Sequence, residues 1–316
     1  MVDLDDPALL TRQDPGAMAA RIAELPESIV KAWQAASEFD LPDEIRSVKS
    51  VVITGMGGSA IGGDLLRTVM EAYGSVPLLV NRDYDLPAFV GPETLVLAAS
   101  YSGDTEETLS AYKQARGRKA QIVCITSGGE LADRAKADKV PEIEIPGGQP
   151  PRTATGFMFF PMLAVLAQRG LLNRDVAADT RAALALLDCL RAQYGPESPS
   201  GQNPAKQLAI ALHARIPVIY GTQGYRGVIA VRWKGQFNDL RTRCLHLLLR
   251  IYRRVTLREN SRFYLTKSLN HAGTACLARP KYQPDERADA REDECRAHPR
   301  IPERSEANTT EHAHDG

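Results

Sequence analysis

The sequence predicts an α/β fold built on doubly wound parallel sheets, and three observations support this. Between residues 48 and 172, short β-branched runs alternate with helix-like stretches, a pattern typical of β-α-β units. Two of these runs end in a glycine-rich or hydroxyl-rich loop that opens a helix, as the strands of such sheets do. A similar pattern of strand, glycines and helix returns near residue 217, so we expect two related domains, the second of them incomplete.

The elements of the first half follow in order. Residues Pro15–Phe39 are expected to form an amphipathic helical lead-in. Five strands are then expected, at Ser50–Thr54, Pro77–Val80, Leu95–Ser100, Gln121–Thr126 and Glu142–Ile145. Helices are expected between or after them, at Ser59–Tyr73, Thr105–Arg116, Glu130–Ala137 and Gly156–Arg169. With right-handed crossovers, the simplest arrangement is the flavodoxin-like strand order 2-1-3-4-5.

The second half begins with a helix at Asp175–Tyr194, and the Gly, Pro and Ser residues of Gly195–Pro204 predict a linker. The segment Pro217–Ile229 repeats the design of Val51–Gly63, with glycines at the same two positions. Beyond it only Leu245–Val255 and Phe263–Leu269 could supply further strands, too little for a whole sheet. We therefore predict a helical lead-in at residues 1–45, a first domain at 46–173, a helix and linker at 174–204, a truncated or divergent second domain at 205–278, and a charged, disordered tail at 279–316.

Composition excludes several classes of function. The 316 residues contain 39 basic and 39 acidic side chains, so the net charge is zero and nothing favours a nucleic-acid partner. The longest apolar run, Phe157–Ala167, is far shorter than the roughly 20 residues that a membrane-spanning helix needs, and the acidic N-terminus is unlike a signal peptide. The five cysteines show no C-x-x-C spacing, which fits a reducing compartment. We expect a cytoplasmic protein with no membrane partner and no bound metal.

Although the total charge is zero, charge is distributed unequally before and after Asn238. The residues after it hold 15 basic and 12 acidic side chains, a net charge of +3, and the first 238 residues carry −3. The same stretch holds five of the six histidines and three of the five cysteines. Two interpretations remain open: a divergent, partly disordered C-terminus, or translation in a shifted reading frame.

Two loops contain the candidate ligand-binding residues. The first, Gly55–Asp64, follows the first predicted strand and opens a helix, whose N–H groups and partial positive charge suit a phosphate. The second, Ser100–Thr108, follows the third strand and groups the hydroxyls of Ser100, Ser102 and Thr105 around Gly103. In a sheet of order 2-1-3-4-5 the first and third strands are neighbours, so both loops should open onto one crevice at the carboxyl ends of the strands.

Three alternatives accompany this interpretation. Ser59 and Thr105 could simply cap their helices, because Ser and Thr are favoured at helix starts whatever the function. The spacing Gly55-x-Gly57-x-x-Ala60 also fits a dinucleotide fingerprint. The second strand ends in Asn81-Arg82, with no acidic residue for a ribose 2′-hydroxyl, but Arg82 could serve NADP. Arg152, which follows the fifth strand, can reach the crevice as a second anion contact or remain an ordinary surface arginine.

These motifs resemble those of sugar isomerase (SIS) domain proteins and, within them, the bifunctional phosphoglucose/phosphomannose isomerases. The matching segments, found between residues 15 and 238, are GMGGSAIGGD (55–64), SYSGDTEET (100–108), PRTATG (151–156) and PVIYGTQGYRGVIAVRWKGQFN (217–238). The resemblance implies two SIS domains, a homodimer, and interconversion of glucose 6-phosphate or mannose 6-phosphate with fructose 6-phosphate, without a cofactor.

Carried over residue by residue, the resemblance gives a candidate site. The phosphate cradle of the family falls on Gly57, Gly58, Ser59, Ser100, Ser102 and Thr105, and its substrate-facing arginine falls on Arg152. The catalytic Glu of an N-E-N segment corresponds to Asp239, which is one methylene shorter and is followed by leucine. Asn270-His271 lies too far along the chain to match the ring-opening histidine, and the C-terminal catalytic lysine has no counterpart.

We therefore expect an aldose-ketose isomerase that works through an enediol, with activity reduced or lost in this chain. A phosphosugar-binding SIS protein without catalysis is the alternative, and an NADP-dependent oxidoreductase is a third.

Overall fold

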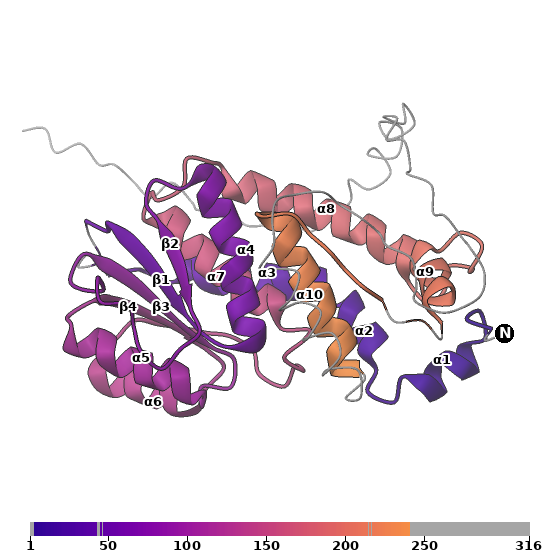
Figure 1. Ribbon diagram of the computed structural model, residues 1–316, viewed down its shortest axis with the longest axis horizontal. Helices are drawn as coiled ribbons and strands as arrows, with labels where there is room; N and C mark the ends of the chain where they lie inside the picture. Colours follow the sequence, from indigo (N-terminus) through magenta and orange to yellow (C-terminus); the bar gives the residue numbers. More distant parts are fainter. Residues whose placement is uncertain (1–2, 43–44, 46, 214, 216, 241–316) are drawn as a thin grey trace, which may run out of the picture.

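The centre of the molecule is a five-stranded parallel sheet with the order β2-β1-β3-β4-β5. The structure is a computed structural model that describes residues 3–240 apart from residues 43–44, 46, 214 and 216 (Figure 1). The strands are β1 (Ser50–Thr54), β2 (Leu78–Asn81), β3 (Thr94–Ser100), β4 (Gln121–Thr126) and β5 (Glu142–Glu144). The predicted flavodoxin-like order is confirmed, and each predicted strand is present to within two residues at either end.

Four helices connect or follow these strands: α4 (Gly57–Tyr73), α5 (Glu106–Gly117), α6 (Gly129–Asp138) and α7 (Thr155–Gln168). They match the predicted helices to within two residues. The lead-in consists of α1 (Pro7–Gln13), α2 (Met18–Ala23) and α3 (Leu25–Glu38), where one helical stretch from Pro15 was expected. The remaining helices are α8 (Val176–Tyr194), which Asp175 caps, α9 (Pro204–Leu212) and α10 (Tyr225–Leu240).

Helices cover both faces of the sheet. The side chains of its buried strands point alternately to the two faces, and each face has its own hydrophobic core. Val51 and Ile53 of β1 pack with α3, α4, α7 and α8, whereas Val52 faces the core formed with α5 and α6. This alternation follows from the period of two in a strand. The result is a three-layer α/β/α arrangement, as expected for a sheet whose strands are buried on both faces.

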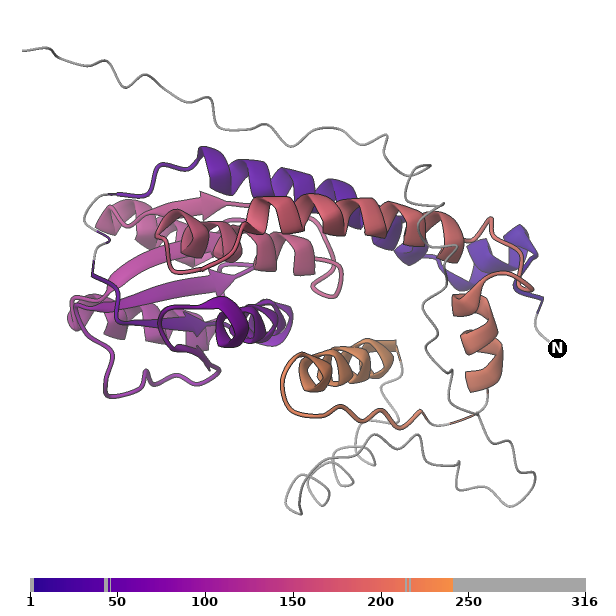
Figure 2. The ribbon, with the colours of Figure 1, turned by 90° about the horizontal axis from the view of Figure 1, so that it is seen from above.

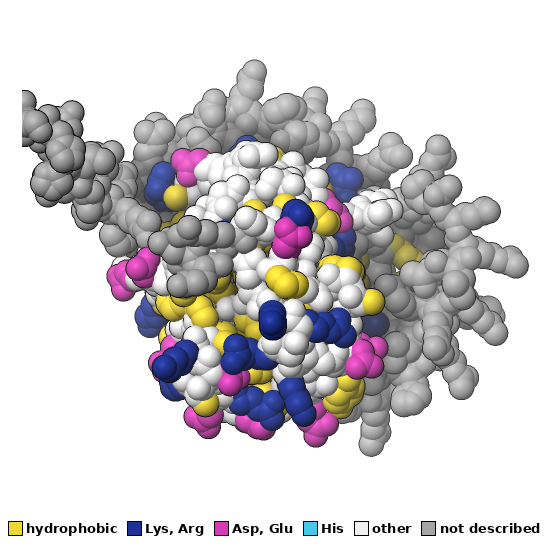
Figure 3. All heavy atoms as spheres, turned by 90° about the vertical axis from the view of Figure 1, so that its left-hand side faces the viewer, with side chains coloured by type: hydrophobic (Ala, Val, Ile, Leu, Met, Phe, Trp, Pro, Cys, Tyr) yellow, Lys and Arg dark blue, Asp and Glu magenta, His cyan; other side chains and the backbone are white. Residues whose placement is uncertain are grey.

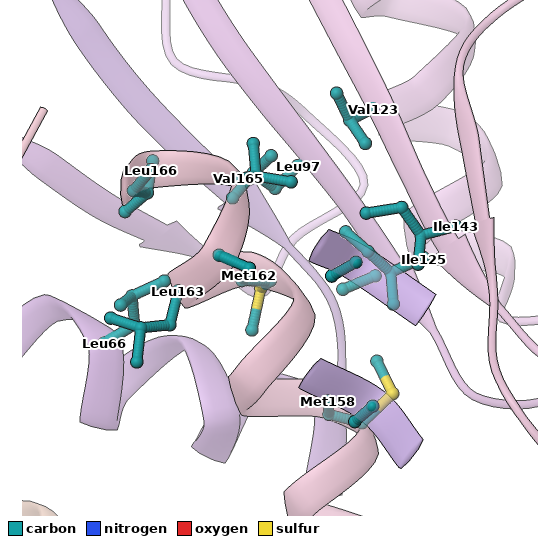
Figure 4. Packing of buried hydrophobic residues seen from close by; sticks show 14 of the residues in the cluster. Leu66, Leu97, Val123, Ile125, Ile143, Met158, Met162, Leu163, Val165 and Leu166 are labelled. Atoms are coloured by element: carbon teal, nitrogen blue, oxygen red, sulfur yellow. The ribbon is translucent and has the colours of Figure 1, made fainter. Parts of the chain in front are cut away.

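The larger core is packed closely between the sheet and α7, which carries the apolar run of the sequence. Leu97 and Ile125 of the sheet face Met162 and Val165 of α7, and all four are fully buried (Figure 4). At the contact between α4 and α7, a Cβ atom on Gly62 would lie 3.2 Å from the backbone of Met158. The absence of a side chain at residue 62 therefore lets the two helices approach closely. The apolar run is core, as its composition suggested.

The lead-in and α8 extend the molecule beyond the sheet. Helix α8 packs along α3 and continues to α9, near which α1 also lies (Figures 1 and 2). Asp5 accepts hydrogen bonds from the Ser200 backbone N–H and hydroxyl (2.9 Å each) and from Lys206 Nζ (2.9 Å). Lys206 also donates to the Pro196 carbonyl (2.7 Å), and its side chain is only 9% exposed. This ion pair ties the start of the chain to α9.

The expected second domain is described only in part. Helix α10 follows the glycines of the repeated motif, as expected, but residues 217–220 do not form a strand. A strand needs a neighbour for its backbone hydrogen bonds, and all five strands among the described residues belong to the first sheet. The segments Leu245–Val255 and Phe263–Leu269, the pair Asn270-His271 and the tail at 279–316 lie outside the described residues, so these predictions stay predictions.

In the part of the chain that the structure covers, no helix has both the length and the apolar character required to cross a membrane.

Candidate functional site

The first and second loops meet where β1 and β3 end. These strands are direct neighbours, with Thr54 opposite Ala98. A Cβ atom on Gly55 would lie 2.6 Å from the Ala99 carbonyl oxygen and 3.2 Å from the Ser59 Cβ. Only glycine fits there, and its place between Ala99 and Ser59 brings the start of α4 against the end of β3. The two loops therefore meet at the carboxyl ends of these strands, as the strand order predicts; that they line a crevice stays a prediction.

Ser59 does not cap α4. The N-cap position is Met56, no side chain caps this helix, and Ser59 lies within the first turn, two residues after Gly57. Ser59 is 6% exposed, and its hydroxyl makes no hydrogen bond to any other described residue. The simple capping alternative is therefore wrong for Ser59, and its hydroxyl remains available to a ligand.

The three hydroxyls of the second loop have different roles. Ser100 is 1% exposed, and its Oγ accepts a hydrogen bond from the Gly103 N–H (3.1 Å) and pairs with the Thr105 hydroxyl (2.9 Å). Ser102 is exposed, and its Oγ accepts from the Asp104 N–H (3.3 Å). Thr105 occupies the N-cap position of α5 but makes no side-chain capping bond. Ser100 thus shapes the loop, and Ser102 and Thr105 are the hydroxyls that can reach a ligand.

A third loop, at residues 127–128 between β4 and α6, supports the second. Gly103 has φ +81°, and a Cβ atom there would lie 1.8 Å from the Gly128 carbonyl oxygen. The Leu131 N–H donates to the Gly103 carbonyl (3.0 Å), and the Glu130 N–H donates to Asp104 Oδ1 (2.9 Å). Sequence reasoning missed this loop, although the two glycines between a strand and a helix were a usable signal.

Residues 147–153, which we call the Arg152 segment, contact the start of α4. A Cβ atom on Gly58 would lie 2.7 Å from the Pro151 carbonyl oxygen, so the first turn of α4 touches this segment directly. The Arg152 carbonyl accepts hydrogen bonds from Arg232 and from Gln236 Nε2 (3.2 Å), both on α10. Helix α10 therefore packs against the site. Asp239 follows Gln236 by three residues on this helix, but its side chain lies outside the described part.

The position of Arg82 weakens the dinucleotide alternative. Its guanidinium pairs with Asp64 and also donates to the Ala60 carbonyl (3.3 Å). A group held by a carboxylate is poorly placed to receive the 2′-phosphate of NADP. The described residues also contain no cluster of three or more His, Cys, Asp and Glu side chains suited to a metal ion.

A hollow of about 410 Å³ lies away from this crevice, between α5 and α6. Figure 3 shows that end of the molecule, where Lys and Arg side chains gather in the lower half among Asp and Glu. Asp138 lies in the hollow, accepts from the Tyr112 hydroxyl (2.7 Å) and sits 3.3 Å from Arg116 Nε. Basic residues at helix C-termini such as Arg116 and Lys136 complement the helix dipoles. The Asp138 carboxylate in the hollow disfavours an anion there.

Comparison with known proteins agrees with the fold. A SIS domain model matches residues 44–160, and a model of the bacterial phospho-glucose isomerase C-terminal SIS domain matches residues 201–240. The bifunctional phosphoglucose/phosphomannose isomerase of Caldicellulosiruptor bescii is 44% identical over 219 residues, which is 69% of this chain and 64% of that protein. The enzyme of the same name from Thermoplasma acidophilum is 38% identical, over 64% of this chain and 58% of that protein.

Another relative carries a different name. The D-glucosamine-6-phosphate 4-epimerase of Sulfolobus acidocaldarius is 30% identical over 209 residues, 66% of this chain and 62% of that protein. The chain thus matches less than two thirds of the length of each of these relatives. Residues 44–160 match the SIS domain model, and over 219 residues the chain is similar to a bifunctional phosphoglucose/phosphomannose isomerase.

Proposed function

We propose that the crevice between the first, second and Arg152 loops binds the phosphate of a hexose 6-phosphate, and that the chain is an aldose-ketose isomerase. The observation that carries this proposal is the contact among the three loops at Gly55 with Ala99 and at Gly58 with Pro151. These contacts support our inference that the hydroxyls of Ser59, Ser102 and Thr105 lie near the Arg152 segment. The names of the sequence relatives support the same substrate class.

The chemistry of these groups suits a phosphate. A phosphate monoester carries about −1.5 to −2 charges near pH 7 and offers three strong acceptor oxygens. Hydroxyl donors and a guanidinium can bind these oxygens through charge-assisted hydrogen bonds. The starts of α4 and α5, neither of which has a side-chain cap, add N–H groups and the positive ends of two helix dipoles. We infer that these groups hold the phosphate and position the distant carbons C1 and C2.

The isomerisation itself requires a base. Once the ring is open, the base takes the proton from C2 of the aldose while O1 gains a proton, which gives the enediol. The base then returns its proton to C1 while O2 loses its hydroxyl proton, which yields the ketose. The base must lie within about 3 Å of these protons. Asp239 is our candidate, because it follows Gln236, whose side chain bonds to the Arg152 segment, by three residues in sequence.

The shorter side chain of Asp239 favours a second candidate function, phosphosugar binding with little or no turnover. Replacing a glutamate by an aspartate withdraws the carboxylate by on the order of 1 Å, and such a displacement can cost about 100-fold in rate. We further propose that the protein acts in the cytoplasm as a homodimer, which size-exclusion chromatography with light scattering would check.

Calorimetry and a turnover assay test these proposals. We expect fructose 6-phosphate to bind, and fructose and NADPH to show no measurable binding. If fructose 6-phosphate fails to bind, the proposed function is wrong. Asp239→Glu should raise turnover by about 100-fold and Asp239→Asn should abolish it. If Asp239→Asn isomerises as fast as the unaltered chain, Asp239 is not the base.

A further inference from the structure

Tyr101 lies in the hydroxyl loop between Ser100 and Ser102, but its phenol bonds to a different segment. Its hydroxyl donates to the Pro146 carbonyl (3.0 Å) and accepts from the Gln149 N–H (2.8 Å). The half-buried ring packs against the larger core. Burial raises the pKa of Tyr101, although the Gln149 N–H and the charge of Arg21 oppose this. The phenol therefore stays protonated near neutral pH and keeps its donor.

The backbone of the same residue is bonded to the third loop. The Tyr101 carbonyl accepts hydrogen bonds from the Ser127 N–H (3.2 Å) and the Ser127 hydroxyl (2.6 Å). Tyr101 is thus bonded to the loop after β4 through its backbone and to the loop after β5 through its side chain. A phenylalanine there would keep the ring and the backbone bonds but lose both bonds of the hydroxyl.

A short chain of hydrogen bonds leads from Tyr101 to Arg152. The side-chain oxygen of Gln149 accepts from the Thr153 hydroxyl (3.1 Å) and from Arg21 Nη1 (3.1 Å). Thr153 is the neighbour of Arg152 in sequence, and its N–H donates to the Pro150 carbonyl (2.9 Å). Gln149 therefore links Tyr101 to the turn that carries Arg152. Its backbone N–H bonds to the Tyr101 hydroxyl, and its side chain bonds to Thr153 in that turn.

We propose that Tyr101 is a positioning residue that sets the Arg152 segment relative to the hydroxyls of Ser102 and Thr105. The inference rests on the proposed function, because it assigns Tyr101 a role in phosphate binding at that same crevice. Tyr101 acts through Arg152 and need not touch the sugar phosphate. Loss of its hydroxyl lets residues 147–153 move, so the guanidinium spends less time in the binding position.

The test combines calorimetry with a double-mutant cycle. Tyr101→Phe should weaken the binding of fructose 6-phosphate by about three- to tenfold, as expected for losing one or two neutral hydrogen bonds. The same substitution in an Arg152→Ala background should change affinity by less than about 1.5-fold, because the group it positions is gone. Tyr112→Phe is the matched control: it also removes a phenol bonded within the fold, at Asp138, but away from the crevice, and should leave affinity unchanged.

A second measurement does not depend on the ligand. Amide hydrogen exchange across residues 147–153 should be faster in Tyr101→Phe than in the unaltered protein and unchanged in Tyr112→Phe. Unaltered affinity in Tyr101→Phe, or an equal loss in both backgrounds, would overturn the positioning role and leave the proposed function standing. If the unaltered protein does not bind fructose 6-phosphate, the proposed function fails, and faster exchange would then still support the role of Tyr101 in ordering the segment.

Discussion

Replacing Gly103 with alanine should disrupt the hydroxyl loop more than any single hydroxyl deletion. A non-glycine residue at φ +81° costs about 1–2 kcal/mol. The new Cβ would lie 1.8 Å from the Gly128 carbonyl oxygen, which is backbone and cannot rotate away. Separating the two atoms by more than about 1 Å should break the Leu131–Gly103 bond (3.0 Å) and the Thr126–Gly128 bond (2.8 Å), each contributing about 1 kcal/mol. We therefore expect a loss of about 3–4 kcal/mol in the free energy of unfolding.

Urea unfolding followed by circular dichroism measures this loss, and calorimetry with fructose 6-phosphate should show binding reduced below detection. Gly117→Ala is the matched control, because no atom lies within 4 Å of its added Cβ and the residue ends α5. That change should be neutral or stabilising by about 0.5 kcal/mol. If the free energy of unfolding of Gly103→Ala lies within about 1 kcal/mol of that of the unaltered protein and its affinity for fructose 6-phosphate is similar, the second and third loops are not in close contact.

Three further predictions concern binding, the core and a thiol. The double substitution Ser102→Ala/Thr105→Ala removes two hydrogen bonds to a charged group, each worth about 1.5–3 kcal/mol, so calorimetry should show fructose 6-phosphate affinity at least tenfold lower; affinity within twofold of the original would contradict the assignment of these hydroxyls. Leu97→Ala, at a fully buried position of the central strand, should lower the free energy of unfolding by about 2–5 kcal/mol in urea titrations. Leu79→Ala, at a residue 39% exposed on the edge strand, should lower it by less than about 1 kcal/mol. Equal losses would mean that the core is misassigned. Burial, together with the nearby Glu142 and Asp138 carboxylates, raises the pKa of the Cys124 thiol. At pH 8, iodoacetamide should therefore label Cys124 in urea but not in the folded protein, as checked by peptide mass spectrometry. Fast labelling of the folded protein would show that this thiol is accessible.

The first sheet could be predicted from the sequence because its strands are short β-branched runs separated by helices of the right length. Once a parallel sheet is inferred, the handedness rule leaves few topologies, and the meeting of the Gly55 and Ser100 loops follows from the strand order. The helices α1 and α9 were not predicted, because each is short and their stability comes from the contacts around Asp5 and Lys206, which join residues distant in sequence.

The roles of individual hydroxyls needed the structure. Ser59, Ser100 and Thr105 look alike in the sequence, since each stands near the start of a helix. Only their hydrogen bonds distinguish Ser100, which holds the loop, from Ser59, whose hydroxyl has no partner among the described residues. Arg82 likewise could not be excluded as an NADP contact until Asp64 was found beside it.

The ion pair of Asp5 with Lys206 also constrains how the chain folds as it is made. The two residues are 201 positions apart, so the lead-in waits for its anchor while the sheet and α8 are synthesised. At about 5–20 residues per second, this wait is about 10–40 seconds, long compared with the microseconds in which a helix forms. The start of the chain is therefore made first, and its anchor at Lys206 is made about 200 residues later.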